Sequence, residues 1–221
     1  MSAPSAYGLR VPRSLAEVLE APDQVALIVY DAQVGVLAQI PDAERVTGAI
    51  ARTLEVARRG GLRVIFSRHV HLPPRLMGVS GLRTGMVWEG TDDPSAVRPL
   101  LARDSPGFAL VPELHVADDE AVFDKTAMSV FEGTPVDTVL RDCGVNAFAI
   151  CGVALEIGIE PSVRHGLDLG YIPIVVRDAC GYRDEAAAQR AYEGFAFAGT
   201  PLVTDLAGFE AALLSSRTAA G

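Results

Sequence analysis

The feature that most constrains the fold is an unbroken apolar run that ends in a glycine and leads into an amphipathic segment. Residues 147–151 are apolar at every position, Gly152 follows, and the amphipathic segment ends at Gly170. A strand that is apolar throughout is typical of a parallel sheet covered on both faces, whereas the second pattern predicts a helix. The turn between them therefore lies at the carboxyl edge of the sheet, where open α/β folds build their sites.

The same alternation of apolar runs and helical patterns extends over most of the chain. Strands are predicted at residues 25–30, 62–67, 121–125, 147–151, 171–176 and 200–203. Helices are predicted at residues 42–59, 134–143, 184–198 and 205–215, besides the one that follows Gly152. This spacing indicates parallel pairing with right-handed crossovers. The predicted fold class is α/β, a three-layer α/β/α sandwich with a mainly parallel sheet.

Pro, Ser and Ala are frequent in residues 1–24, which we expect to form an N-terminal arm with a short helix near residues 14–20. Residues 25–221 are expected to form a single domain. Within it, residues 69–120 are interrupted by Gly and Pro and predict a long loop. Loops of this length are usually functional lids or partner-binding segments.

Charge and cysteine content limit the partners and the compartment. The net charge of -9 argues against nucleic acid or an anionic membrane as a partner. No apolar run reaches the roughly 18 residues that a membrane span needs. Three cysteines without paired spacing suit a reducing cytoplasm rather than a disulfide framework. We therefore expect a cytoplasmic protein with a small-molecule substrate, and the apolar composition is compatible with a homodimer or larger homo-oligomer.

Two ionisable residues follow predicted strands and should meet at one edge of the sheet. Asp31 comes after the strand at residues 25–30, and Lys125 ends the strand at residues 121–125. A carboxylate and a lysine that converge there can keep each other ionised and share a proton-transfer task. An aspartate at a strand end taken alone is more often a helix cap or a turn residue.

Three motifs resemble the isochorismatase-like hydrolase superfamily, also called the cysteine hydrolases. They are VALIVYDAQ around Asp31, FDKTAMSVFEGTPVDTVLRDCGV around Lys125, and ICGVALEIGIEPSVRHGLDLGYIPIVVRDACG. The resemblance extends from about Val25 to Asp205 and implies a working triad of Asp, Lys and Cys. Asp31 and Lys125 match the first two members. The resemblance also implies a cis peptide bond in the turn Val153-Ala154.

The position that matches the nucleophilic Cys is Gly158, which has no side chain that could attack a substrate. The superfamily contains a branch with Gly here, the isochorismatases, which cleave a vinyl ether without a covalent intermediate. This likeness implies Asp31 as the general acid and Lys125 as the group that orients it. Gly158 would leave room for substrate, and its N–H could face a bound anion.

The cysteines of this chain are not expected to replace the missing thiol. Cys151 lies within an apolar strand and is interpreted as a small core residue. Cys180 is expected in an exposed turn without a base beside it, and Cys143 at a helix end is interpreted as structural.

Six residues are expected to contact substrate: Gln33, Trp88, Val153, Ala154, Glu156 and Gly158. Isochorismatases tend to carry an aromatic residue and a His where this chain has Ala154 and Glu156. Glu156 is interpreted either as a helix-start acid with a capping role or as a second carboxylate that raises the pKa of Asp31 or activates water. Trp88 is expected either to cover the pocket or to pack at a subunit contact.

His69 and His71 are two positions apart and would point the same way at strand spacing, but two ligands do not make a closed metal site. We expect neither a metal nor a cofactor. Three functions stay open at this point. The first is hydrolysis of a small anionic vinyl ether without a covalent intermediate, and the second is C–N (amide-type) hydrolysis with activated water. The third is a catalytically silent relative that binds a small molecule.

Overall fold

A six-stranded parallel sheet forms the centre of the computed structural model, which describes residues 3–218. The strand order is β5-β4-β3-β6-β7-β8. The strands are β3 (Val25–Tyr30), β4 (Arg63–His69), β5 (Ala121–Lys125), β6 (Ala147–Gly152), β7 (Ile172–Cys180) and β8 (Leu202–Thr204). The two central strands, β3 and β6, are buried at every residue, as their unbroken apolar sequences predict.

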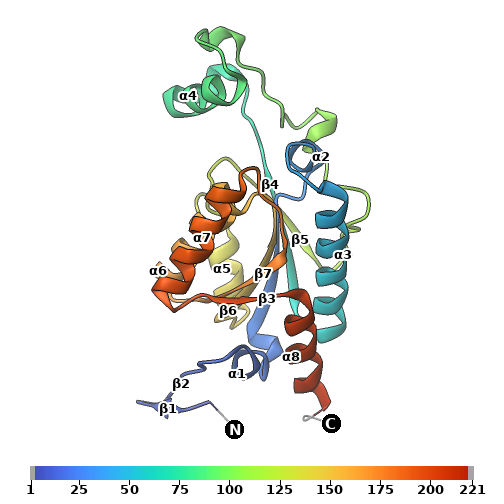
Figure 1. Ribbon diagram of the computed structural model, residues 1–221, viewed down its shortest axis with the longest axis vertical. Coiled ribbons are helices and arrows are strands. Elements are labelled where there is room, and N and C mark those ends of the chain that lie inside the picture. The colour runs from blue at the N-terminus through green and yellow to red at the C-terminus, as the bar shows by residue number, and fades with distance from the viewer. Residues whose placement is uncertain (1–2, 219–221) are drawn as a thin grey trace.

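Helices cover both faces of this sheet (Figure 1). One face carries α3 (Ala43–Gly60) and α8 (Leu206–Thr218), and the other carries α5 (Val136–Asp142), α6 (Glu160–Asp168) and α7 (Glu185–Ala198). Successive residues of β3 alternate between the two cores, since side chains along a strand point to opposite faces. The predicted three-layer α/β/α fold is confirmed, and Tyr30 faces the layer of α5, α6 and α7.

The N-terminal residues form a short hairpin of β1 (Ser5–Ala6) and β2 (Leu9–Arg10), followed by α1 (Leu15–Leu19) and the turn η1 (Pro22–Gln24). Ser14 caps α1, because its side chain accepts a hydrogen bond from the N–H of Glu17. This end of the chain lies at the edge of the sheet away from the carboxyl ends of the strands (Figure 1).

Two local predictions need correction. Asp42 precedes α3 as expected, but its backbone is left-handed (φ +52°) and its side chain makes no capping hydrogen bond. Cys180 does not lie in an exposed turn: β7 continues past a register irregularity opposite β6, so that Cys180 pairs with Gly152 and is buried. The pairing between strands, which a single strand's sequence does not show, decides where β7 ends.

The long predicted loop contains a helix of its own, α4 (Gly78–Glu89), together with the turns η2 (Pro74–Leu76), η3 (Pro94–Ala96) and η4 (Pro106–Phe108). We call residues 72–100 the projecting arm, because they stand clear of the sheet above the carboxyl ends of its strands (Figure 1). No residue of α4 is buried. The helix was missed because its glycines and its lack of a buried face remove the periodic pattern that identifies a helix in sequence.

Within residues 3–218, no helix combines the length and the apolarity that crossing a membrane requires.

Candidate active site

Asp31 lies at the carboxyl end of β3, where the chain leaves the sheet in a left-handed conformation (φ +43°). The short turn segment α2 (Val34–Leu37) follows it. Its carboxylate is held on both sides: Oδ1 accepts a hydrogen bond from Ser67 Oγ at 2.6 Å, and Oδ2 accepts one from Lys125 Nζ at 2.6 Å. Ser67 comes from β4, the strand between β3 and β5. The three neighbouring strands therefore build one buried polar cluster.

Lys125 is fully enclosed, and three oxygens surround its ammonium group. These are Asp31 Oδ2 at 2.6 Å, Tyr30 Oη at 2.8 Å and the carbonyl oxygen of Ala127 at 3.1 Å. An ammonium group has three hydrogens to donate, so each one has an acceptor. Burial lowers the pKa of Lys125, and the charge of Asp31 offsets part of this effect. The predicted convergence of Asp31 and Lys125 is thus present in the fold.

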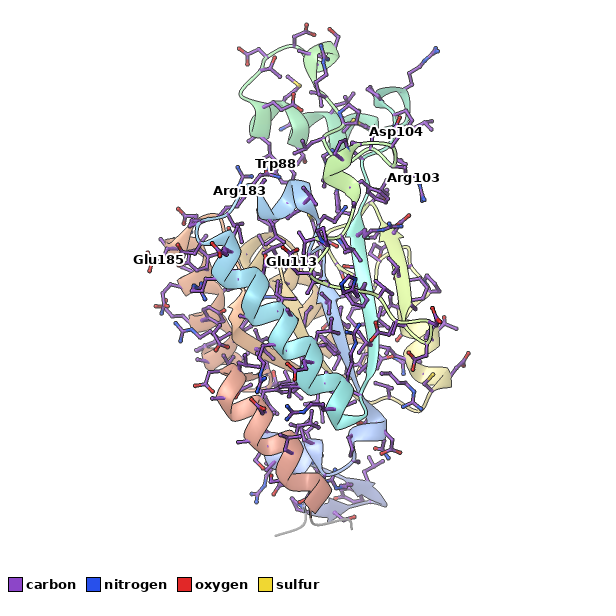
Figure 2. All side chains as sticks on the ribbon, turned by 90° about the vertical axis from the view of Figure 1, so that its right-hand side faces the viewer. Trp88, Arg103, Asp104, Glu113, Arg183 and Glu185 are labelled. Atoms are coloured by element: carbon purple, nitrogen blue, oxygen red, sulfur yellow. The ribbon has the colours of Figure 1, made fainter. Side chains whose placement is uncertain are left out.

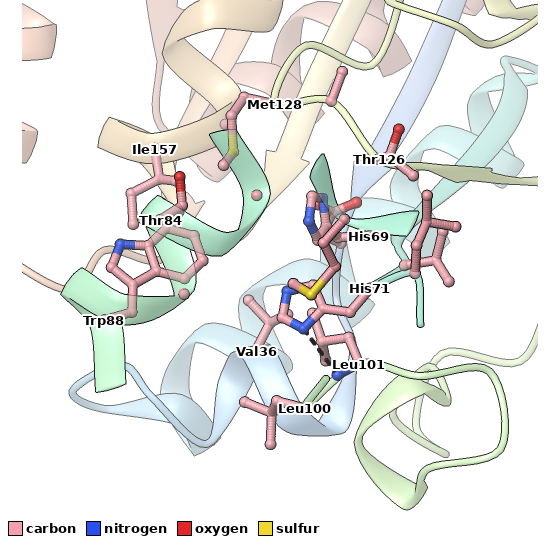
Figure 3. A pocket seen from close by; sticks show the side chains of 18 of the residues that line it. Val36, His69, His71, Thr84, Trp88, Leu100, Leu101, Thr126, Met128 and Ile157 are labelled. Carbon is pink, nitrogen blue, oxygen red and sulfur yellow. Dashed lines mark hydrogen bonds between the residues drawn. The ribbon is translucent and has the colours of Figure 1, made fainter. Parts of the chain in front are cut away.

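A cavity of about 760 Å³ lies between this cluster and the projecting arm. Its floor includes Asp31 and Gly158, and its walls include Trp88 and Leu101 from the arm side. Figure 3 shows Trp88 on α4 beside Ile157, with His69 and His71 on the opposite side. The volume is in the range typical of small-molecule sites.

Four of the six expected substrate contacts line this cavity: Trp88, Val153, Ala154 and Gly158. Trp88 lines the cavity from α4, a position compatible with the first of its two expected roles. The peptide bond between Val153 and Ala154 is cis, as the family resemblance implies.

Gln33 and Glu156 do not line the cavity, which corrects the expectation that they contact substrate. Gln33 is fully buried and clamps two segments: its Nε2 donates to the carbonyls of His69 and Phe108 at 3.0 and 2.9 Å. Glu156 Oε1 accepts the N–H groups of Arg183 and Asp184 at 2.8 and 3.1 Å. Glu156 Oε1 thus holds the segment that leads into α7, whereas Oε2 is buried without a hydrogen-bond partner among the described residues.

Gly158 lies in a single π-helical turn, η5 (Leu155–Ile159), between β6 and α6. Its N–H donates to the carbonyl oxygen of Ala154 at 3.0 Å. The expectation that this N–H faces a bound anion is therefore corrected, because it is already used within the turn. Such π turns are frequent at functional sites.

Two members of the polar cluster, Tyr30 and Ser67, were missed in the sequence. Each is the polar exception at or near the end of an apolar strand, which is a usable signal. The pattern did not reveal which of the two faces each side chain takes, nor that both reach the Asp31–Lys125 pair.

None of the cysteines lines the cavity. Cys151 and Cys180 are buried, and burial raises the pKa of both thiols. Cys143 is exposed at the end of α5. The interpretation of Cys151 as a core residue agrees with its position in β6.

His69 lines the cavity close to the Lys125 ammonium. Burial, and then the positive charge of Lys125, lowers the pKa of His69 from 6.5 to about 4. Within the described residues, no group of three or more His, Cys, Asp or Glu side chains is arranged to hold a metal ion.

The lowered pKa of His69 predicts a pH-dependent stability. Between pH 6.5 and about 4 the unfolded chain binds more protons at this residue than the folded chain, so stability rises with pH across this window. His69→Gln should remove up to roughly 3 kcal/mol of this rise, at about 1.4 kcal/mol per pKa unit. Urea unfolding across the window measures it, with exposed His115→Gln as the control. Parallel pH profiles for parent and His69→Gln would contradict this assignment.

Comparison with known proteins places the chain in a family. Residues 25–205 match the isochorismatase domain. The ureidoacrylate amidohydrolase RutB of Methylobacterium radiotolerans is 30% identical over 184 residues, which are 80% of this chain and 70% of that protein. An isochorismatase family protein from Desulfovibrio vulgaris is 25% identical, with a TM-score of 0.72 over 86% of this chain and 98% of that one.

A cysteine hydrolase from Pseudomonas syringae has the same fold, with a TM-score of 0.73, 23% identity, and coverage of 88% of this chain and 94% of that one. The match to the isochorismatase domain agrees with the parallel sheet and with the polar cluster at its carboxyl edge. The chain belongs to the isochorismatase family and is an isochorismatase-like hydrolase.

Proposed function

We propose that this hydrolase cleaves a small anionic vinyl ether by protonation from Asp31, without a covalent enzyme intermediate. The observation that carries the proposal is the buried Asp31–Lys125 pair, joined at 2.6 Å, with Asp31 lining a cavity that no cysteine lines. Acid catalysis needs a proton held next to the substrate, and this pair holds one between its oxygen and its nitrogen.

The reaction requires one proton and one water. The proton shared by Asp31 and Lys125 passes from the carboxyl group to the enol carbon, which leaves an oxocarbenium ion at the neighbouring carbon. Water adds to this ion and releases a proton, which returns to the Asp31–Lys125 pair. The hemiketal then collapses to a carbonyl compound and an alcohol, so that the net change is addition of one water.

Arg183 supports an anionic substrate. It lies at the cavity wall, and its guanidinium carbon is 6.0 Å from the centre of the Trp88 ring (Figure 2). Among the described residues, no carboxylate lies within 4.0 Å of Arg183. The other arginine that lines the cavity, Arg98, already donates to the carbonyl oxygens of Ser95 and Ala96. A guanidinium group in this position can bind a substrate carboxylate through two hydrogen bonds.

A second candidate is C–N hydrolysis of a ureido or carbamoyl compound. The named activity of the RutB relatives favours it. In this case the Asp31 carboxylate would take a proton from water, which attacks the carbonyl carbon directly, because no thiol lines the cavity. Both candidates use the same pair of residues and differ in the direction of the first proton transfer.

We also propose a homo-oligomer and a cytoplasmic location. The projecting arm exposes Leu76, Val79 and Val87, which supports a homo-oligomer in which a second copy covers them. A cytoplasmic location is supported by the unpaired cysteines.

The test compares carboxylate-bearing enol ethers with ureido and carbamoyl amides under identical conditions. We expect turnover of the enol ethers, unchanged when Cys143, Cys151 and Cys180 are all replaced. Glu156→Gln should keep turnover within about threefold, because its remaining side-chain oxygen still accepts the two N–H groups.

Turnover of the amides alone would support the second candidate and overturn the first. Loss of activity in Glu156→Gln with an unchanged fold would instead assign water activation to Glu156. A covalent adduct on any cysteine, detected by mass spectrometry during turnover, would overturn the non-covalent mechanism.

A further inference from the structure

The space next to Gly158 is filled by the side chain of Tyr30. A Cβ atom built on Gly158 would lie 2.0 Å from Tyr30 Oη, 2.4 Å from Cζ and 2.6 Å from Cε1. All three distances are far inside ordinary carbon contacts, which lie near 3.5–4.0 Å. A side chain at position 158 and the phenol ring of Tyr30 therefore exclude each other. The phenol of Tyr30, at the end of β3, occupies the place that a side chain at position 158 would take.

The hydroxyl group of Tyr30 makes two hydrogen bonds. It donates to the carbonyl oxygen of Met128 and accepts a hydrogen bond from Lys125 Nζ at 2.8 Å. The same ammonium nitrogen lies 4.3 Å from the centre of the Tyr30 ring. Tyr30 is only 2% exposed, and burial raises its pKa well above the usual value. A neutral phenol whose proton is bound to a carbonyl is not a nucleophile, so its contribution must act through Lys125.

We propose that Tyr30 is a positioning residue of the site: its phenol takes the volume of a side chain at Gly158 and holds the Lys125 ammonium against Asp31. The part of this proposal that concerns turnover rests on the function proposed above. The part that concerns Lys125 and Gly158 does not.

The Lys125 ammonium has three hydrogens and three acceptors, and the hydroxyl of Tyr30 is one of these acceptors. This gives a reason for a tyrosine at the end of a strand that is otherwise aliphatic. Phenylalanine would fill the same volume but leave one buried N–H of Lys125 and the Met128 carbonyl without partners. An unpaired buried N–H disfavours the charged form of the amine. The hydroxyl therefore keeps Lys125 protonated at the position from which it serves Asp31.

The hydroxyl is tested with Tyr30→Phe, with Tyr171→Phe as the control, because Tyr171 also buries a bonded hydroxyl but contacts Asp137 instead. Lys125 is the sole lysine in the sequence, so protein labelled with ¹³C-lysine gives one side-chain signal to titrate by NMR. In Tyr30→Phe we expect the Lys125 pKa to fall by about one unit. We expect kcat to fall about tenfold with KM within about twofold, and the alkaline limb of the kcat profile to move to lower pH by the same amount.

A Lys125 titration unchanged in Tyr30→Phe would overturn the proposal, whatever happens to stability. A shifted titration in a protein that turns over none of the substrates would support the placement of Lys125 and count against the proposed function alone. A shift of equal size in Tyr171→Phe would also overturn it, because the effect would not be specific to the site.

The exclusion between Tyr30 and Gly158 is tested by a double-mutant cycle in a Cys143→Ser background. We expect Gly158→Cys alone and Tyr30→Val alone each to lower the urea midpoint, and the combination to lower it by clearly less than the sum. The new thiol in the combined variant should then react with iodoacetamide, because the removed phenol opens it to the cavity. Additive midpoints, or a single Gly158→Cys variant as stable as the parent, would overturn the exclusion.

Discussion

Asp31→Asn is expected to lower kcat/KM by about 10³-fold, within the range that removal of a general acid or base produces. Asparagine keeps the size of the side chain. Its one oxygen can still accept a hydrogen bond from Lys125 while its amide NH2 donates to Ser67 Oγ, but it cannot pass on a proton. The loss should therefore appear mainly in kcat. Initial rates at saturating and at limiting substrate, together with circular dichroism of the variant, measure it.

The matched control is Asp124→Asn, one residue before Lys125 on β5. Asp124 is also partly buried and paired, with Arg68 and Arg103, but it does not line the cavity. Its turnover should stay within about threefold of the parent, because no proton transfer depends on it. An Asp31→Asn variant that is folded and retains more than a tenth of the parent rate would remove Asp31 from the mechanism.

Lys125→Met should have the second large effect, on both turnover and stability. It removes the ammonium from a carboxylate that is itself only 4% exposed and leaves Asp31 with Ser67 as its remaining side-chain partner. Breaking a buried ion pair in this way costs about 3–5 kcal/mol of the free energy of unfolding. Urea denaturation measures the loss, and turnover should fall with it because the shared proton is gone.

The comparison that isolates the charge is the double variant Asp31→Asn with Lys125→Met. It should be more stable than Lys125→Met alone, since no uncompensated carboxylate stays buried. Arg103→Met breaks a pair whose arginine side chain is 69% exposed and should cost no more than about 1 kcal/mol. A Lys125→Met variant as stable as Arg103→Met would mean that the pair is not buried in solution.

Local sequence was a good guide to the sheet. Continuous apolar runs identified β3 and β6 to within a residue, because a strand covered on both faces must be apolar at every position. Asp31 and Lys125 could be placed together for the same reason, since the carboxyl ends of parallel strands share one edge. The arm was mispredicted as loop, since a helix without a buried face has no sequence period to detect.

What the sequence alone determined is the α/β class and the edge of the sheet at which the carboxylate and the amine meet. Only the tertiary structure decided how the remaining groups are used. It turned Glu156 toward the segment before α7 and placed Ser67 beside Oδ1 of Asp31, the oxygen that does not bind Lys125. It also placed the phenol of Tyr30 against Gly158. The physical reason is that strand periodicity records whether a position is buried, whereas hydrogen-bond partners and shared volume depend on residues distant in the chain.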